Sequence, residues 1–326
     1  MTLEAIAQST PAISVIIPSY NTAGLISRCL DSVFAQTFSD FEVIVVNDGS
    51  PDTPQLEQVL EPYRARIVYI VQENKRAAGA RNTAIARARG EFLAFLDSDD
   101  SWLPHHLASQ MQFLRENSAL DLVYADALIR THSAHPKTFM QTCPSEGTAT
   151  FDALVAERCQ IPVSTVVVRK AVLVKAGGFD ESLSRCDDYD MWLRCAFWGA
   201  QIGYRRDVQA RLSLGRPDAL SNSPSKMSET YWHILQKAAQ TLPLAEAQRK
   251  LLAGRAAQVK ARTLLEQGKL QLRQRHPERA RELFAAANQH FRTLKLTMAI
   301  RGLELAPWPA CRLLAAWHRF RNRITV

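Results

Sequence analysis

The first 130 residues alternate between short apolar runs and segments with helical spacing, and this alternation constrains the fold more than any other feature. Runs rich in Val, Ile, Leu and Phe occupy residues 13–18, 41–47, 65–72, 91–97 and 121–129. Segments with apolar residues on one helical face lie between them, at 23–36, 54–63, 78–90 and 103–117. Fully apolar strands that alternate with helices form parallel sheets covered on both faces. The sequence therefore predicts an α/β, Rossmann-like domain with a mostly parallel central sheet.

Polar residues gather where three of these predicted strands end. The first strand runs into Pro18-Ser19-Tyr20-Asn21, the second into Asn47-Asp48, and the fourth into the cluster 97–100. Ligands of such sheets bind beyond the carboxyl ends of the strands. One site can therefore use all three groups. A single polar group at a strand end could arise by chance, but three of them favour a functional site.

The cluster Asp97-Ser98-Asp99-Asp100 places three carboxylates in four positions. Like charges at this spacing are unfavourable unless a cation or hydrogen-bond donors compensate them. Mg²⁺ and Mn²⁺ prefer carboxylate oxygens and leave positions open for water and phosphate. A helix N-cap before Leu103 is the alternative, but a cap needs only one of these residues. We therefore favour a metal site.

Two further positions fit a nucleotide. Asp48 can accept hydrogen bonds from a base or ribose, although an Asp-Gly turn explains it as well. Arg81 and Asn82 lie near the start of a predicted helix, where both the helix end and a guanidinium favour phosphate. The alternative for Arg81 is a side chain that faces solvent.

A second acidic cluster, Asp187, Asp188 and Asp190, opens the predicted helix of "CDDYDMWLR", whose buried side includes Trp192. Carboxylates are favourable at a helix amino terminus, so capping is one interpretation. Three acids exceed what a cap needs. A carboxylate here could instead act as general base toward a substrate hydroxyl.

The carboxyl-terminal third differs in charge and pattern. From Lys226 onward the chain holds 19 Lys and Arg against 6 Glu and no Asp, giving +13, while the whole chain carries +8. Gly and Pro are rare before Gly302, so helices are expected throughout. Basic helices can meet anionic lipid, nucleic acid or an acidic partner, or simply form a solvated face. No nucleic-acid-binding motif is present, so nucleic acid ranks last.

Targeting features are few. Residues 1–12 lack a positive region followed by a long apolar run, so no signal peptide is expected. No stretch reaches the ~20 apolar residues that span a bilayer. The six cysteines are scattered without a C-x-x-C pair, which argues against disulfides or zinc and favours a reducing cytoplasm.

Six short motifs occur in an order that resembles glycosyltransferase family 2. They are SVIIPSYN (14–21), VNDGS (46–50), GARN (79–82), FLDSDD (95–100), GGFDE (177–181) and DDYDMWLR (187–194). The resemblance implies a GT-A fold over residues 13–225. A nucleotide-sugar-binding half would span 13–130 and an acceptor-binding half 131–225. A tail at 1–12 precedes this domain, and a basic helical region at 226–326 follows it.

The resemblance implies a metal-dependent, inverting transfer of a sugar from a nucleotide diphosphate donor to an acceptor hydroxyl. The donor would be held by Pro18, Tyr20, Asn21, Asp48, Arg81, Asp97 and Ser98. Asp99, together with Asp97, would hold a divalent cation, Mn²⁺ or Mg²⁺. Asp188 would be the catalytic base. Contacts with the acceptor or a phosphate would come from Asp187, Trp192 and Arg216.

Departures from the family pattern narrow the expected function. Asp187 stands where Glu is usual, and "LGRPDALSN" (214–222) lacks the histidine that members often carry there. No Gln-x-x-Arg-Trp occurs, so processive polymer synthesis is disfavoured. We expect a UDP-sugar donor, with GDP- and dTDP-sugars as alternatives. The acceptor would be a glycan or lipid-linked glycan of the cell surface or envelope, and the protein would be cytoplasmic and peripheral at the inner membrane face.

Two other functions compete with this one. A non-catalytic nucleotide-sugar or glycan-binding module of the same fold is the main alternative, although Asp97, Asp99 and Asp188 argue against it. A nucleotidyltransferase would normally carry a Gly-rich signature after the first strand, and "PSYNTAG" is not one.

Overall fold

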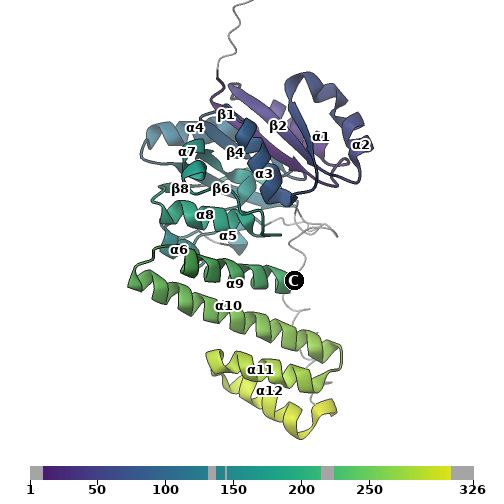
Figure 1. Cartoon of the computed structure of the whole chain (residues 1–326), viewed down its shortest axis with the longest axis vertical. Coiled ribbons are helices and arrows are strands. Elements are labelled where there is room, and N and C mark those ends of the chain that lie inside the picture. Colours follow the sequence, from purple (N-terminus) through teal and green to yellow (C-terminus); the bar gives the residue numbers. More distant parts are fainter. Residues whose placement is uncertain (1–9, 131–136, 144, 214–223, 310–326) are drawn as a thin grey trace, which may run out of the picture. The chain divides into compact units, whose positions relative to one another are not determined.

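The computed structural model describes residues 10–130, 137–143, 145–213 and 224–309 (Figure 1). The chain divides into two compact units, residues 1–222 and 223–326. The predicted division of the first unit into donor and acceptor halves at residue 130 stays a prediction.

In the part of the first unit that the structure describes, eight strands form one sheet in the order β3-β2-β1-β4-β7-β6-β8-β5 (Figure 1). The strands are β1 (Ile13–Ser19), β2 (Phe41–Asp48), β3 (Val68–Gln72), β4 (Phe92–Phe95), β5 (Ser101–Trp102), β6 (Leu122–Ile129), β7 (Val167–Arg169) and β8 (Ile202–Leu212). Strands β1 to β4 run parallel to one another. The predicted α/β class and mostly parallel sheet are confirmed.

Helices cover both faces of this sheet. The helices are α1 (Ile26–Phe34), α2 (Thr53–Leu60), α3 (Arg76–Arg87), α4 (His106–Glu116), α5 (Phe139–Thr142), α6 (Phe151–Val155), α7 (Lys170–Lys175) and α8 (Asp187–Phe197), with 3₁₀ turns η1 (Glu61–Arg66) and η2 (Val163–Thr165). Apolar residues of α1, α2 and α4 pack on alternate residues of β1, β2 and β4, such as Val15 and Val43. The intervening residues, including Ile16 and Ile44, are buried on the opposite face, where α3 packs on β1 and β2. This two-sided burial is why the strands are apolar throughout.

One predicted helix begins later in the structure, and two later segments contribute short or irregular strands to the sheet. The helix expected at 103–117 begins at His106, because Ser101 and Trp102 instead pair with β8 as strand β5. Residues 163–169 form the turn η2 and the short β7, which runs antiparallel to both β4 and β6. Residues 202–212 form a single strand, β8, with a bulge opposite Asp126.

The second unit is helical over the residues that the structure describes. Its helices are α9 (Pro224–Thr241), α10 (Glu246–Arg273), α11 (Pro277–Phe291) and α12 (Leu294–Leu305). The expected helices are present, and Pro277 opens α11, a position that suits its fixed φ. Gly268 of α10 lets the ring of Phe284 approach closely, because an added Cβ would lie 2.5 Å from that ring. Among the described residues, no helix is long and apolar enough to cross a membrane.

Candidate active site

The carboxyl ends of β1, β2 and β4 meet at one edge of the sheet. Ile16 of β1 lies in register with Ile44 of β2 and with Phe95 of β4, so the three strands end at a similar level. Hydroxyl groups link the loops that follow, since the Thr22 Oγ1 lies 2.9 Å from the Ser98 Oγ. The structure therefore brings together the residues after strands one and four, as the sequence predicted.

Asp48 is buried at the end of β2 and fixed by donors from the next loop. Its Oδ1 accepts hydrogen bonds from the Gln72 side-chain amide at 2.6 Å and from the Lys75 backbone N–H at 2.8 Å. The following Gly49 has φ +64° and approaches the backbone of Asn74 so closely that a Cβ would lie 2.8 Å from its nitrogen. These contacts hold one carboxylate oxygen and orient the group. Gln72, Lys75 and Asn74 carried no sequence signal.

The loop after β1 is held in an unusual conformation. Pro18 is the sixth residue of β1, and Asn21 has a positive φ of 54°, a region that Asn tolerates better than most residues. The Asn21 backbone N–H donates to the Ser50 Oγ at 2.7 Å, and the Ala23 N–H donates to Asp52 at the same distance. Tyr20 is exposed between these anchored positions. Its ring is therefore available at the edge where the strands end.

The cluster after β4 has three acids with three different environments. Asp97 accepts an ion-paired hydrogen bond from the Arg81 Nη2 at 2.6 Å and keeps a third of its side-chain surface in contact with solvent. Asp99 is half-buried, and its backbone carbonyl accepts hydrogen bonds from Arg28 at 2.6 Å and from the Ser213 hydroxyl at 2.6 Å. Ser98 is buried against Thr22.

Asp100 is a structural acid. Its Oδ2 accepts from the Ser164 hydroxyl at 2.6 Å, and its Oδ1 accepts from the Ser213 backbone N–H at 2.7 Å. Burial raises the pKa of Asp100 well above its ordinary value, and the nearby Asp99 and Asp97 raise it further. None of the acids caps α4, because its N-cap is His105 and makes no side-chain cap bond.

Arg81 of α3 joins the two acidic clusters. Its guanidinium pairs with Asp97 through Nη2 and with Asp187 through Nη1, and it lies 5.5 Å from the centre of the Phe179 ring. Burial lowers the pKa of Arg81, but Asp187 and Asp97 outweigh burial and raise it above the ordinary value. The predicted solvent-facing alternative is wrong, since the side chain is buried.

The second acidic cluster opens α8. Cys186 has a left-handed φ of 55° and turns the chain so that Asp187 and Asp188 stand in the first helical turn, where carboxylates are favourable. Burial, followed by the charge of Asp187, raises the pKa of Asp188 to about 6. Asp190 is committed elsewhere, because it pairs with Arg194 at 2.7 Å.

Neighbouring residues fix α3 to the segment before α8. The Asn82 amide donates to the Phe179 carbonyl, and its oxygen accepts from the Phe179 N–H, both at 2.9 Å. Trp192 is buried, with its ring 6.1 Å from those of Phe95 and Phe179. Trp192 thus packs against Phe179, the ring that lies beside Arg81. Its predicted contact with the acceptor stays a prediction. Arg216 lies outside the described residues.

The site can supply only part of the ligands that a divalent cation needs. No group of three or more His, Cys, Asp or Glu side chains is arranged to hold a metal among the residues that the structure describes. The described side chains therefore do not form a complete coordination sphere for a metal ion. Asp99, with the solvent-accessible Asp97, fits a cation that takes its remaining ligands from phosphate and water, as Mg²⁺ commonly does.

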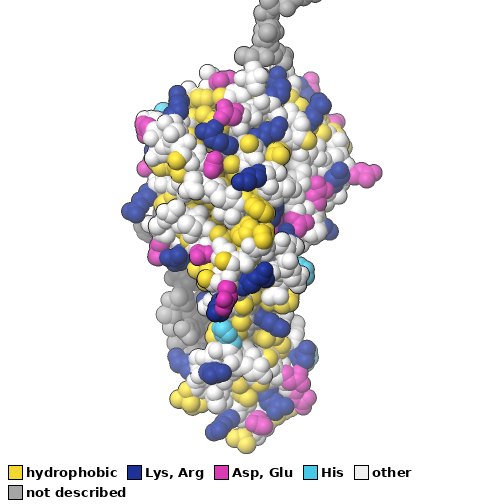
Figure 2. All heavy atoms as spheres, turned by 60° about the vertical axis from the view of Figure 1, so that its left-hand side comes forward, with side chains coloured by type: hydrophobic (Ala, Val, Ile, Leu, Met, Phe, Trp, Pro, Cys, Tyr) yellow, Lys and Arg dark blue, Asp and Glu magenta, His cyan; other side chains and the backbone are white. Residues whose placement is uncertain are grey.

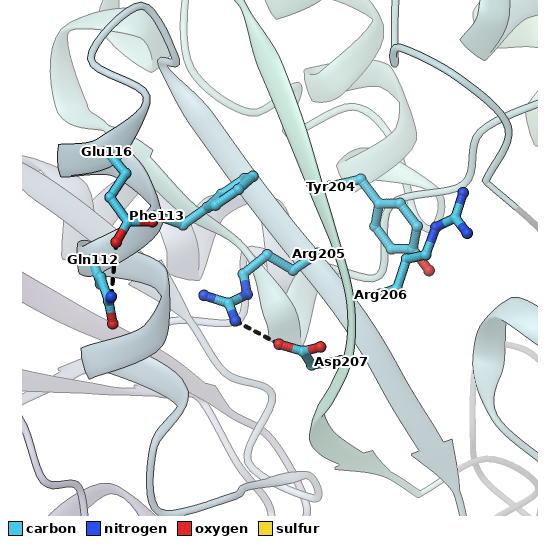
Figure 3. A pocket seen from close by; sticks show the side chains of 7 residues that line it. All are labelled: Gln112, Phe113, Glu116, Tyr204, Arg205, Arg206 and Asp207. Atoms are coloured by element: carbon cyan, nitrogen blue, oxygen red, sulfur yellow. Dashed lines mark hydrogen bonds and ion pairs between the residues drawn. The ribbon is translucent and has the colours of Figure 1, made fainter.

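A separate pocket lies on another part of the first unit, between α4 and the first half of β8 (Figure 3). Its volume is about 340 Å³, and it is lined by Gln112, Phe113, Glu116, Tyr204, Arg205, Arg206 and Asp207. Arg205 lies over the Phe113 ring and pairs with Asp207, while Gln112 bonds Glu116. None of the predicted site residues lines this pocket, and its charges largely satisfy one another.

Comparison with known proteins places the chain among glycosyltransferases. Residues 14–153 match the family described as "Glycosyl transferase family 2". The Escherichia coli protein WfgD, named as a UDP-Glc:α-D-GlcNAc-diphosphoundecaprenol β-1,3-glucosyltransferase, is 35% identical over 182 residues, which cover 56% of this chain and 68% of WfgD. Two glycosyltransferases from Rickettsia typhi and Rickettsia prowazekii are 31% and 30% identical over 188 residues, and the match spans 58% of the length of each.

Solved structures share the fold. Residues 1–349 of S. aureus TarS align with a TM-score of 0.62 and 22% identity, covering 94% of this chain and 91% of that chain, and TarS has also been solved with UDP-GlcNAc. The mannosyltransferase PcManGT from Pyrobaculum calidifontis, solved with GDP-Man and Mn²⁺, aligns with a TM-score of 0.61 and 20% identity over 95% of this chain and 84% of its own. The family match, the WfgD similarity and this shared GT-A-like architecture agree with the six motifs, and the chain belongs to glycosyltransferase family 2.

Proposed function

We propose that the protein transfers a sugar, with inversion, from a nucleotide diphosphate sugar to an acceptor hydroxyl. One observation carries the proposal: Arg81 holds Asp97, from the loop of the predicted donor site, and Asp187, the neighbour of the predicted base, in a single arrangement. Donor and acceptor chemistry would therefore take place at the same edge of the sheet. A binding module without catalysis would have no use for the half-buried Asp188 beside it.

The donor we propose is a UDP-sugar. The loop residues Pro18, Tyr20 and Asn21 would contact the nucleoside, and the oriented Asp48 would accept a hydrogen bond from the base. TarS, which shares the fold, binds UDP-GlcNAc, and WfgD is named for UDP-Glc. Arg81, Asp97 and Ser98 would complete the donor side of the site.

A divalent cation, Mn²⁺ or Mg²⁺, would be held by Asp99 with Asp97. When bound, it would neutralise charge on the diphosphate leaving group. The fold relative PcManGT was solved with Mn²⁺. The chain's own contribution is to fix the backbone of Asp99 through Arg28 and Ser213, so that its carboxylate has a defined direction.

Asp188 would accept the proton of the acceptor hydroxyl as that oxygen attacks the anomeric carbon from the side opposite the diphosphate. A pKa of about 6 leaves most of this carboxylate ionised at neutral pH, while making it a stronger base than an ordinary Asp. Asp187 would hold Arg81 and stand beside the acceptor. A single displacement of this kind inverts the anomeric configuration.

The acceptor we propose is a glycan or lipid-linked glycan of the cell surface or envelope, as the name of WfgD describes for that protein. A lipid-linked acceptor would place the enzyme at the cytoplasmic face of a membrane. The basic helices of the second unit would then meet the anionic surface, which attracts Lys and Arg at about 1 kcal/mol each.

A screen of nucleotide sugars tests the function. Thermal shift with and without Mn²⁺ should show stabilisation by one UDP-sugar, and the same sugar should be transferred or slowly hydrolysed with release of UDP. Asp188→Asn should keep the thermal shift and lose the release. Binding without any UDP release by the unaltered chain, even with added glycan acceptors, would instead favour the non-catalytic module.

A further inference from the structure

Helix α12 has apolar residues on two sides. On its inner side, Leu296, Ile300 and Leu303 pack in a cluster with Leu272, Ala280 and Phe284 of α10 and α11. This contact accounts for how α12 is held in the unit. A surface helix of a globular protein is normally polar on its remaining side.

The outer side of α12 instead carries large apolar side chains, with the exposed Arg301 on the same face. Leu294 is 74% exposed, Met298 64% and Leu305 85%, and their spacing places all three on one face of a helix with 3.6 residues per turn. Trp308, just beyond the end of α12, is 59% exposed. We name these four residues the α12 apolar face. Single exposed apolar side chains are ordinary, but a group of large ones marks an interaction surface.

Basic residues accompany this face. Lys295 and Arg301 are exposed on α12, and Arg292 is exposed just before it. The one acid of α12, Glu304, forms an exposed ion pair with Arg281 of α11 at 3.5 Å. Over the part of the second unit that contains α11 and α12 (Figure 1), Figure 2 shows hydrophobic side chains interspersed with Lys and Arg and with some acidic side chains.

Charge decides among the occupants of the α12 apolar face. Residues 226–326 carry +13, so a second copy of this chain would bring like charges together. Of this charge, four arginines and no acid belong to residues 310–326: Arg312, Arg319, Arg321 and Arg323. Packing these residues onto the face would also concentrate positive charge. A partner that is apolar inside and anionic outside satisfies both properties.

We propose that the α12 apolar face docks on a membrane that contains anionic lipid. Leu294, Met298, Leu305 and Trp308 would enter the boundary between headgroups and acyl chains, while Lys295 and Arg301 would contact the phosphates. Trp favours this boundary because its ring is apolar and its N–H is polar. The inference deepens the proposed function, since it rests on a lipid-linked acceptor and names the surface that would bring the enzyme to it.

Vesicle flotation of the full-length protein tests the docking. Binding should be strong to phosphatidylcholine vesicles that contain phosphatidylglycerol, weak to phosphatidylcholine alone, and weakened by salt. The double variant Met298→Glu/Leu305→Glu should bind the anionic vesicles at least about tenfold more weakly.

The matched control is Gln240→Glu/Ala247→Glu. It adds the same charge at exposed positions of the second unit, outside the α12 apolar face, and should lose much less binding. Circular dichroism and thermal melting of both variants check that the unit folds. Transfer to a water-soluble acceptor should be unchanged in both, so a failure of docking is distinguishable from a failure of the proposed function.

Four outcomes would overturn the proposal. The full chain could fail to bind anionic vesicles, or the two double variants could bind them equally. The chain could form a concentration-dependent dimer, without vesicle binding, that Met298→Glu/Leu305→Glu dissolves, which would assign the face to a second copy. Vesicle binding that appears only after deletion of 310–326 would assign the face to that segment.

Discussion

The two acidic clusters of the site repeat one division of labour with different means. In each cluster one acid is structural: Asp100 after β4 and Asp190 in α8. A second acid, Asp97 in the first cluster and Asp187 in the other, pairs with Arg81. The third, Asp99 or Asp188, is the one proposed for chemistry. Asp100 accepts hydrogen bonds from a hydroxyl and a backbone N–H, whereas Asp190 forms an ion pair with the guanidinium of Arg194.

This comparison teaches that a run of acids is not a single ligand set. Three carboxylates within four positions are tolerated because their neighbours differ, and the cation proposed for Asp99 would be shared with Asp97, which also pairs with Arg81. The loop after β4 accommodates its structural acid with neutral donors, and burial raises the pKa of Asp100. The helix accommodates its structural acid with Arg194 four residues later.

Asp188→Asn should have the largest effect on activity. Loss of a general base commonly lowers the rate by about 10²–10⁴-fold, while the isosteric amide leaves the fold intact. Transfer is measured as UDP release in the presence of acceptor, and donor binding by calorimetry. Asp190→Asn is the matched change in the same helix. It should lower the melting temperature, because Arg194 loses its partner, and spare most of the rate.

Arg81→Met should break both clusters at once. The variant leaves Asp187 buried without its cation and should lose about 3 kcal/mol of unfolding free energy, the lower end for a broken buried pair because water reaches Asp97. Urea denaturation measures this loss. Arg81→Lys keeps the charge but cannot pair with two carboxylates in the same fork geometry, so it should restore only part of it. Equal stability of all three proteins would contradict the bridging role.

Asp99→Asn and Asp100→Asn should separate the two acids after β4. We expect Asp99→Asn to weaken Mn²⁺-dependent binding of the UDP-sugar by about tenfold or more, because the cation loses a charged ligand. Asp100→Asn can still accept from Ser213 and donate to Ser164, at a cost of about 1 kcal/mol in stability. Calorimetric titration with and without Mn²⁺ distinguishes them. The reverse order of effects would exchange the two assignments.

The pH dependence of kcat/KM is the smallest of the expected effects and the one most specific to Asp188. Asp188 must be ionised to accept a proton, and its pKa is raised to about 6, so kcat/KM should be halved near pH 6 and fall about tenfold per unit below it. Because the charge of Arg81 lowers the pKa of Asp188, Arg81→Met should move this acidic limb to higher pH. An ordinary Asp as base would put the limb near pH 4 instead.

Local patterns made the strands and the site edge predictable. Apolar runs and helical spacing are read within a few residues, and the parallel order then places residues 18–21, 47–48 and 97–100 at one edge. Arg81 could be singled out but not its partners, because Asp187 is 106 positions away and only the packing of α3 near α8 brings the two together.

Other features depend on tertiary pairing alone. Strand β5 is two residues long and exists because β8 lies beside it, so no periodicity announces it. Asp100 looked like a helix starter, yet its partners Ser164 and Ser213 come from distant segments. The exposed side of α12 was also hidden, because a helical pattern does not tell which of two apolar sides will be covered.

The adjacent residues Arg81 and Asn82 have a consequence for engineering this enzyme. Arg81 pairs with Asp187, and Asn82 holds Phe179 and lies 3.1 Å from where a Cβ on Gly178 would stand. Residues 177–190 could be replaced by the loop of a relative to alter acceptor choice. The new loop would need a glycine and a backbone conformation that fit Asn82, and an acid that pairs with Arg81. Chimeras that change both segments together should fold more often than those that change the loop alone.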